Sequence, residues 1–477
     1  MTRTVSMTGS ARARGVATVR GVLAGAGVML LAGCATRPYH APDIRPAALA
    51  NADNDSYVAQ AYDPRWWRQF DDPVLDQLVT RAVASNLDVQ AAVARVRQAR
   101  ALFDDVALDR LPVATVGASI DRRSQIAPGF TEEPITTSTY RAGFDAFWEI
   151  DLFGRVRSAT KAAAANAASL SATLEDVRVS VAAEAARNYF ELRGLQQQLA
   201  VAERSLANQR ETLRLTTVRR DAGIGEEQDV ASAAARVAAI EASVPPLQSA
   251  AAARIHRIAV LEGARPEEPG VDLGPRPYAP IAKALPLGDP AQLLQRRADI
   301  RAAERRVAAS SAREGIARAD LFPRVSITGF LGLLAGRGNL LGSADSRAWA
   351  VTPALSWVGT DLGSVRARVR GAAAGTEEAL ADYDHTVLRA LEETENALVA
   401  YRSDQTRLVK LADQARESAR AAGIARARYR EGLADFLSLL DAERTQLEAE
   451  DAVAQAEAGV YVSVVAVYKA FGGVLGS

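Results

Sequence analysis

Long stretches of the chain repeat hydrophobic residues at alternating spacings of three and four, the pattern of a helical seam. The clearest runs from Arg155 to Arg220, contains no proline and is rich in Ala, Arg, Glu and Gln. At about 1.5 Å per residue this helix would be about 100 Å long, more than a globular domain of this mass contains. Residues 223–225 then turn the chain, and a second helix is predicted from near Glu226 to Gly263, disturbed at Pro245 and Pro246. The pattern predicts a long antiparallel hairpin.

Alternation of apolar and polar side chains predicts two strands before this hairpin. A helix expected from about Pro73 to Asp109, with Trp66, Trp67 and Phe70 capping its start, ends at Pro112, and residues 113–120 form the first candidate strand. The second is clearer. One of its faces carries Tyr140, Ala142, Phe144, Ala146, Trp148 and Ile150, and the other carries Arg141, Gly143, Asp145, Glu149 and Asp151. About ten alternating residues is the length of a tilted transmembrane strand, although a soluble sheet with one buried face would alternate in the same way.

The same pattern occurs twice in the chain. Residues 86–112 and 154–232 recur without gaps at 297–323 and 363–441, at offsets of 211 and 209. The protein is therefore one structural unit written twice, and each half should have the same order of elements.

The second copy is predicted to contain the matching elements. Two alternating strands, over 325–333 and 349–357, flank a glycine-rich loop over 332–346. Helices are expected over 366–430 and 434–471. Six of the 24 residues from 263 to 286 are proline, so an irregular crossover joins the halves.

The amino terminus is typical of an exported protein. Scattered arginines without an acid precede an apolar run over 21–31, which is too short to span a bilayer, and Leu31-Ala32-Gly33-Cys34 follows. Cys34 is the only cysteine, so the chain has no internal disulfide. Leu-Ala-Gly-Cys resembles the bacterial lipobox, which implies cleavage before Cys34, a diacylglycerol on its sulfur and an acyl chain on the new amino group. Ala35 resembles the signal for sorting to the outer membrane. The alternative is a chance cysteine behind a hydrophobic signal.

Charge and catalytic motifs exclude several classes. The chain has 57 basic and 57 acidic residues, and removing residues 1–33 leaves 53 and 57, a net charge of −4 that does not attract nucleic acid. His40, His256 and His385 are isolated from ligand spacings, and no P-loop lysine follows the glycines of 329–342. We therefore expect no enzymatic activity, no metal and no cofactor besides the lipid on Cys34.

The predicted organisation is a signal peptide over 1–33, a lipidated linker over 34–64, a first repeat over 65–263, a crossover over 264–286 and a second repeat over 287–477. The fold class is mostly α with a membrane β-barrel contribution, with four transmembrane strands and two coiled-coil hairpins per chain. Four strands cannot close a barrel, because about eight is the smallest closed number, and an open sheet in lipid leaves unsatisfied edge amides. If these strands lie in a membrane, several chains must therefore share one barrel.

Motifs along the mature chain carry a family resemblance. They are, in order, Trp67 with Phe70-Asp71-Asp72-Pro73-Val74-Leu75, Asn86-Leu87-Asp88-Val89, Trp148-Glu149-Ile150-Asp151-Leu152-Phe153-Gly154-Arg155, Leu293-Leu294 with Arg296-Arg297-Ala298-Asp299-Ile300, Tyr429-Arg430-Glu431-Gly432, Leu437-Ser438-Leu439-Leu440-Asp441-Ala442 and Tyr468-Lys469-Ala470-Phe471-Gly472-Gly473. Together they resemble the TolC-like outer membrane factors, in the lipoprotein (NodT-type) branch that serves as the exit duct of tripartite efflux pumps. The family usually has proline where Ala298 stands.

The resemblance implies a homotrimer in the outer membrane. Three chains would form a twelve-stranded barrel in contact with outer membrane lipid, continuous with a twelve-helix barrel that crosses the periplasm. The duct would be closed at its periplasmic helix tips and would open when a periplasmic adaptor (membrane fusion) protein and an inner-membrane pump engage it. The cargo would be small molecules or drugs.

The resemblance and the repeat together indicate a gate. Asp441 and Arg444 correspond to Ser232 and Ala235 in the first copy, so only one hairpin carries this charge pair. In the family, the aspartate of the Leu-Leu-Asp-Ala motif forms an acidic ring at the constricted mouth, a role that the resemblance gives to Asp441. Arg444 can pair with it at i+3, and Tyr429 matches a tyrosine that latches the closed helices. The alternative is an ordinary solvated pair worth about 0.2–0.5 kcal/mol.

The two hairpin turns, Gly223-Ile224-Gly225 and Gly432-Leu433-Ala434, resemble the family tips that meet the adaptor's own helical tips. Glycine after a helix is also plain turn chemistry, and both explanations can hold at once. Two other functions share features of this chain. A type I protein secretion duct would share the whole architecture and differ in its pump and cargo. A periplasmic coiled-coil adaptor or scaffold would contain compact lipoyl-like modules with short strands, which the sequence lacks.

Overall fold

The structure is a computed structural model that describes residues 39–42, 49–51, 57–58, 65–126, 129, 132–278, 285–286 and 296–472. The predicted signal peptide, Cys34, and Leu293, Leu294 and Gly473 of the motifs lie outside the described residues. The chain divides into two compact units. Unit 1 draws on Gln98–Ala168 and Glu304–Ala381, and unit 2 on Asp43–Arg97, Ser169–Ala303 and Asp382–Ser477. Each unit therefore takes segments from both halves of the chain, and the predicted repeat boundaries stay a prediction.

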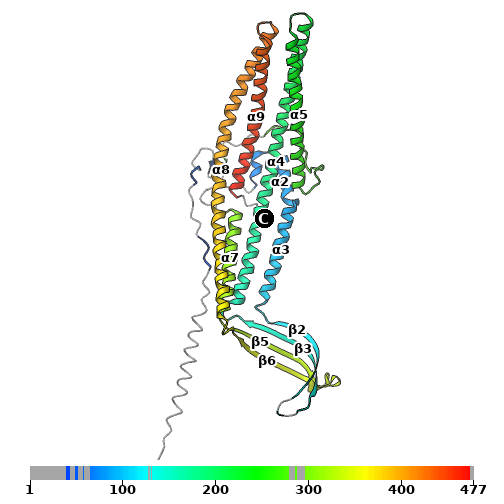
Figure 1. The fold of residues 1–477 in the computed structure, drawn as a ribbon, viewed down its shortest axis with the longest axis vertical. Coiled ribbons are helices and arrows are strands. Elements are labelled where there is room, and N and C mark those ends of the chain that lie inside the picture. Colours follow the sequence, from blue (N-terminus) through cyan, green and yellow to red (C-terminus); the bar gives the residue numbers. More distant parts are fainter. Residues whose placement is uncertain are drawn as a thin grey trace, which may run out of the picture. The chain divides into compact units, whose positions relative to one another are not determined.

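Unit 1 contains a four-stranded antiparallel sheet in the order β2-β3-β5-β6 (Figure 1). The strands are β2 (Val113–Gln125), β3 (Ile135–Ile150), β5 (Arg324–Ala335) and β6 (Arg347–Ser356). Val113 pairs with Phe147, and Arg324 pairs with Ser356. These two pairs are related by the offsets of 211 and 209, so both copies have the same register.

This register sorts the side chains onto two different faces. The apolar face carries exposed large hydrophobic residues on all four strands, which are Val116, Ile120, Phe144, Leu331, Trp349, Val351 and Leu355. The opposite face carries polar groups such as Thr115, Ser119, Arg141, Asp145, Thr328 and Thr352, together with Phe147 and Phe330. Exposed apolar side chains reach 77 % for Val116 and 76 % for Trp349. The alternation predicted for the second strand is present, except that Phe147 lies on the polar face.

Several predicted strand limits were wrong. β2 extends to Gln125 instead of ending at 120, because its polar end pairs with the equally polar start of β3, for example Arg123 with Thr137. Residues 332–335 belong to β5 rather than to the glycine-rich loop. That loop also contains two short 3-10 turns, η3 (Gly338–Leu340) and η4 (Ala344–Ser346).

The strands connect to helices through equivalent contacts in both copies. Trp148 Nε1 donates to the carbonyl of Arg110 at 3.1 Å, and Trp357 Nε1 donates to the carbonyl of Leu321 at 3.1 Å. α4 (Arg155–Asp221) begins where Asp151 accepts hydrogen bonds from the backbone of Val156 and Arg157. An aspartate at this position satisfies amides that a helix start leaves unpaired. α8 (Leu362–Arg430) begins after β6.

The helix predicted over 73–109 is two helices. α2 (Pro73–Ser85) ends at Asn86, which has an extended backbone with ψ 135°, and α3 (Leu87–Leu108) follows. The Asn86 side chain accepts from the amides of Asp88 and Val89 and donates to the carbonyl of Leu261 at 3.1 Å. In the second copy Arg297 precedes α7 (Ala298–Ala319) and donates to the carbonyl of Ala470 at 2.9 Å. Both residues therefore join the start of one helix to the end of the returning helix.

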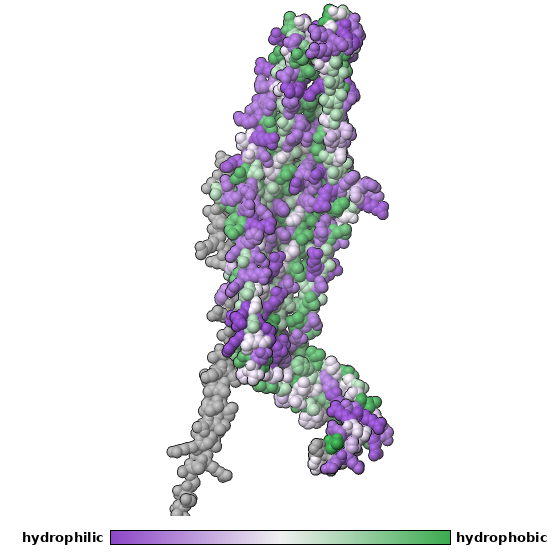
Figure 2. Space-filling model, in the orientation of Figure 1, coloured by the Kyte–Doolittle hydropathy of each residue, from purple (hydrophilic) through white to green (hydrophobic). Residues whose placement is uncertain are grey.

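Unit 2 contains two antiparallel helical hairpins. α5 (Glu227–Leu261) returns beside α4, and α9 (Phe436–Ala470) returns beside α8. α5 continues through Pro245 and Pro246, where a disturbance was predicted. α5 and α9 correspond at the offset of 209 at both ends. Hydrophilic and hydrophobic residues intermix on the visible face of the helices (Figure 2).

An aromatic cluster forms the core of unit 2. Trp66, Trp67 and Phe70 form the 3-10 turn η1 (Trp66–Phe70) before α2, and all three are buried. The centroid of the Phe190 ring lies 4.8 Å from that of Phe70 and 4.9 Å from that of Tyr461. In the crossover, where an irregular segment was expected, β4 (Leu285–Pro286) pairs in parallel with β1 (Tyr57–Val58). Across the part of the chain that the structure describes, every helix is too short or too polar to traverse a bilayer.

Candidate functional site

The two hairpin turns lie at the same end of unit 2 (Figure 1) and have the same backbone geometry. Gly223 has φ 71° and Gly432 has φ 72°, the left-handed conformation that glycine adopts after a helix. Ile224 and Leu433 then donate backbone hydrogen bonds to the carbonyls five residues earlier. Turn chemistry thus accounts for the glycines. It does not account for the next residues, because the side chains of Ile224 and Leu433 are 69 % and 68 % exposed.

Tyr429 is a buried anchor between the hairpins. It packs with Phe436 at 5.9 Å between ring centroids, and the Arg219 guanidinium lies 4.8 Å from the centre of its ring. Arg219 also donates to the carbonyl of Tyr429 at 3.0 Å. Burial raises the pKa of the Tyr429 phenol above its usual value, so the ring stays neutral. The contact joins α4 of the first hairpin to α8 of the second.

Asp441 and Arg444 form an exposed ion pair on α9. Their closest atoms are 2.7 Å apart, and the two side chains are 69 % and 53 % exposed. The hydrogen bond to Asp441 raises the pKa of Arg444 above its usual value. Six residues before Asp441, Asp435 accepts from the amide of Ser438 at 2.7 Å, which lowers the pKa of Asp435 and caps α9. The predicted gate residues therefore divide into a buried anchor and a solvated pair, and their role as a gate stays a prediction.

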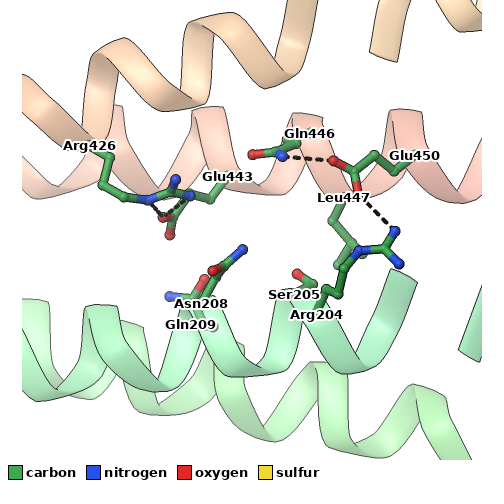
Figure 3. A pocket seen from close by; sticks show the side chains of 9 residues that line it. All are labelled: Arg204, Ser205, Asn208, Gln209, Arg426, Glu443, Gln446, Leu447 and Glu450. Carbon is green, nitrogen blue, oxygen red and sulfur yellow. Dashed lines mark hydrogen bonds and ion pairs between the residues drawn. The ribbon is translucent and has the colours of Figure 1, made fainter. Parts of the chain in front are cut away.

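The sequence reasoning missed a buried bridge beside this pair. Glu443 is 8 % exposed, accepts from Arg426 Nε at 3.0 Å, and accepts from Thr212 Oγ1 at 3.3 Å. It thus connects α9, α8 and α4, and Figure 3 shows its ion pair with Arg426. Comparing the two copies could have revealed this bridge. Glu443 and Arg426 correspond to Ala234 and Thr217 in the first copy, so they differ between the copies in the same way as Asp441 and Arg444.

A polar cavity of about 100 Å³ adjoins this bridge (Figure 3). It is lined by Arg204, Ser205, Asn208, Gln209, Arg426, Glu443, Gln446, Leu447 and Glu450. Glu450 accepts from Gln446 at 2.7 Å and lies 3.8 Å from Arg204. Among the described residues, no cluster of His, Cys, Asp and Glu is arranged to hold a metal ion. The site therefore consists of polar contacts between helices.

Comparison with known proteins defines the class. The family of outer membrane efflux proteins matches residues 78–263 and 290–473. The pyoverdine export outer membrane protein OpmQ of Pseudomonas putida is 30% identical over 93% of this chain and 95% of its own. Nodulation protein T of Rhizobium leguminosarum bv. trifolii is 28% identical over 90% and 92% of the two chains. The solved outer-membrane channel OprN is 51% identical, with a TM-score of 0.90, over 92% of this chain and 99% of its own.

This chain belongs to the outer membrane efflux protein family. It is an outer membrane channel for efflux, in a family of channels rather than of enzymes. The resemblance to the TolC-like and NodT-type factors is confirmed. The mostly helical fold with a four-stranded antiparallel sheet is confirmed as well.

Proposed function

We propose that three copies of this chain form a closed efflux duct, and the sheet is the observation that carries this proposal. In one chain β2 and β6 are its edge strands, and its apolar face is exposed on all four strands. An open edge in lipid is costly because each unpaired backbone group loses its hydrogen bond. Pairing β6 of each chain with β2 of the next removes every edge and turns the apolar face toward lipid.

The proposal also covers the membrane anchor, the gate and the partners. The duct is held by acyl chains on Cys34 and closed at the hairpin tips by Asp441, Arg444 and Tyr429. The tips dock a periplasmic adaptor, which connects the duct to an inner-membrane pump. The family assignment supports efflux of small molecules, and the burial of Tyr429 supports a latch between hairpins.

The trimer is tested by heat-dependent electrophoresis of protein extracted from outer membranes. We expect a trimer without heating and a single chain after boiling. Leu331→Arg should reduce the membrane-inserted trimer, because arginine on the lipid face costs about 2–4 kcal/mol near the bilayer midplane. Thr328→Arg is the matched control, since Thr328 lies on the polar face of the same strand. A lone water-soluble particle, or equal effects of the two substitutions, would overturn the proposal.

Adaptor docking is tested by crosslinking. Ile224→Cys and Leu433→Cys should each form an adduct with a co-expressed adaptor of the same pump, because both side chains are exposed at the tips. Trp148→Cys, at the junction of β3 with the helices, should give none. Adducts at Trp148→Cys, or at only one tip, would contradict docking through both hairpins.

A further inference from the structure

Unpaired charges of opposite sign lie at the two sides of unit 1. Near the end of α3, Asp104 and Asp105 are exposed, and α8 carries exposed Arg366 and Arg370 in its first turns. None of these four forms an ion pair with a described residue of its own chain.

In the first copy the equivalent of Arg366 is Arg157, which forms an ion pair. Arg155 and Arg157 at the start of α4 pair with Glu149 and Asp151, at 2.7 Å and 3.2 Å. The equivalents of those two acids in the second copy are Val358 and Thr360. Arg155 maps to Ser364 and Arg157 maps to Arg366, so Arg366 lacks the acid that pairs with Arg157 in the first copy.

A contact between two helices within the chain is the model for the contact between α3 and α8 of neighbouring chains. α7 comes from the second copy and α4 from the first, and they approach closely at Gly315. A Cβ at Gly315 would lie 3.4 Å from the Cβ of Ser158. β3 and β5 pair beside this junction, for example Asp145 with Phe330.

Applying the offsets of 211 and 209 to this junction gives the equivalent residues at the contact between chains. If β6 of one chain pairs with β2 of the next as β3 pairs with β5, then α3 of one chain lies beside α8 of the other. Gly315 maps to Asp104 and Ser158 maps to Ala367. The change from serine to alanine removes a hydroxyl that would lie 2.9 Å from the added Cβ, which leaves room for the larger aspartate.

The order of charges along the two helices fits this contact. α3 runs toward the sheet and carries Arg100 before Asp104 and Asp105. α8 runs away from the sheet and carries its arginines before Glu377 and Glu378. Because Ala367 lies opposite Asp104 and the helices would be antiparallel, Arg366 lies opposite Asp105, and Arg370 lies opposite Ala101, within about one helical turn of Asp104.

We propose that Asp104 and Asp105 of each chain form a salt-bridge cluster with Arg366 and Arg370 of the neighbouring chain. The partner of this surface is a second copy of the chain, and the inference rests on the proposed trimer. The cluster favours the register in which the sheet closes, because a slip along the edge would move Arg366 away from Asp105. The charges are exposed in one chain and become partly shielded in the assembly, which strengthens their attraction.

Disulfide trapping tests the geometry. Asp104→Cys with Ala367→Cys should give covalent dimers and trimers after oxidation. Gly315→Cys with Ser158→Cys is the matched control, and its bond should form within one chain because 3.4 Å is near the usual Cβ separation in a disulfide of about 3.8 Å. Ser119→Cys with Ala354→Cys tests the sheet register alone, since this pair maps from Asp145 and Phe330.

Charge reversal tests the energetics. Asp104→Arg with Asp105→Arg should lower the temperature at which the trimer dissociates, and adding Arg366→Asp with Arg370→Asp should restore it. Asp413→Arg, in an exposed pair on α8, is the control and should leave that temperature unchanged. Failure to restore overturns the cluster. A sheet crosslink without the helix crosslink also overturns it and leaves the proposed duct standing, whereas absence of any trimer overturns the duct itself.

Discussion

Phe190→Ala should lower the free energy of unfolding by about 3–5 kcal/mol, because it opens a cavity in a core that cannot fully collapse. Phe190 is 2 % exposed and contacts Phe70, Tyr461 and Tyr278 with its ring. These neighbours come from η1, α9 and the crossover, so one side chain supports segments that are far apart in the sequence. The same change should lower the temperature at which the trimer dissociates.

Urea unfolding of the detergent-solubilised protein, followed by far-UV circular dichroism, measures this effect. Val409→Ala is the control, because Val409 lies on α8 with 59 % of its surface exposed and should change stability by less than about 0.5 kcal/mol. Phe190→Leu should fall between the two, since leucine fills part of the cavity. Equal effects of Phe190→Ala and Val409→Ala would show that the aromatic cluster does not stabilise the fold.

The long helices could be predicted from the sequence because their limits are local. The stretch predicted over 155–220 is α4 over Arg155–Asp221, and the helix predicted over 366–430 ends at Arg430. An uninterrupted seam sets the length of these helices, and a glycine with positive φ sets their ends. The break at Asn86 escaped detection because the carbonyl of Leu261 that holds it is 175 residues away.

The strand ends were harder to predict for a related reason. The apolar alternation reports only which residues face an apolar environment, whereas hydrogen bonding continues beyond it. Asp121 to Gln125 have no apolar pattern, yet each pairs with a residue of β3. The hydrogen bonds of β2 thus continue to Gln125, which pairs with Ile135 at the start of β3. The hydropathy pattern does not mark this limit.

The candidate site shows the same division. The family resemblance and the difference between the two copies together predicted Asp441 and Arg444, and the resemblance of the two glycine turns to the family's hairpin tips predicted the docking residues. In the sequence Glu443 looks like a solvated helix charge, but in the structure it is buried in contact with Arg426 and with Thr212 of the other hairpin. Contacts between hairpins depend on their rotation and offset, which the periodicity of either helix alone does not fix.

Replacing both Asp441 and Arg444 with alanine should raise the single-channel conductance in planar bilayers severalfold. In the proposed trimer three copies of this pair converge on the axis at the tips, where they bind one another across the mouth. Removing them leaves Tyr429 and the Glu443 bridge in place within each chain, so the hairpins stay folded while the contacts between chains are lost.

Asp413→Ala with Arg416→Ala is the matched control for this gate. These residues also form an exposed ion pair at i+3, with their closest atoms 2.6 Å apart. They lie on α8, whereas Asp441 and Arg444 lie on α9 near its turn. An isolated exposed pair contributes about 0.2–1 kcal/mol, so its loss alone should leave both the fold and the conductance unchanged. If the conductance rises in the variant without Asp441 and Arg444 but not in the control, the effect comes from the position of this pair near the hairpin tips. Unchanged conductance in both would remove Asp441 from the gate and leave Tyr429 and Glu443 as the groups that hold the tips closed.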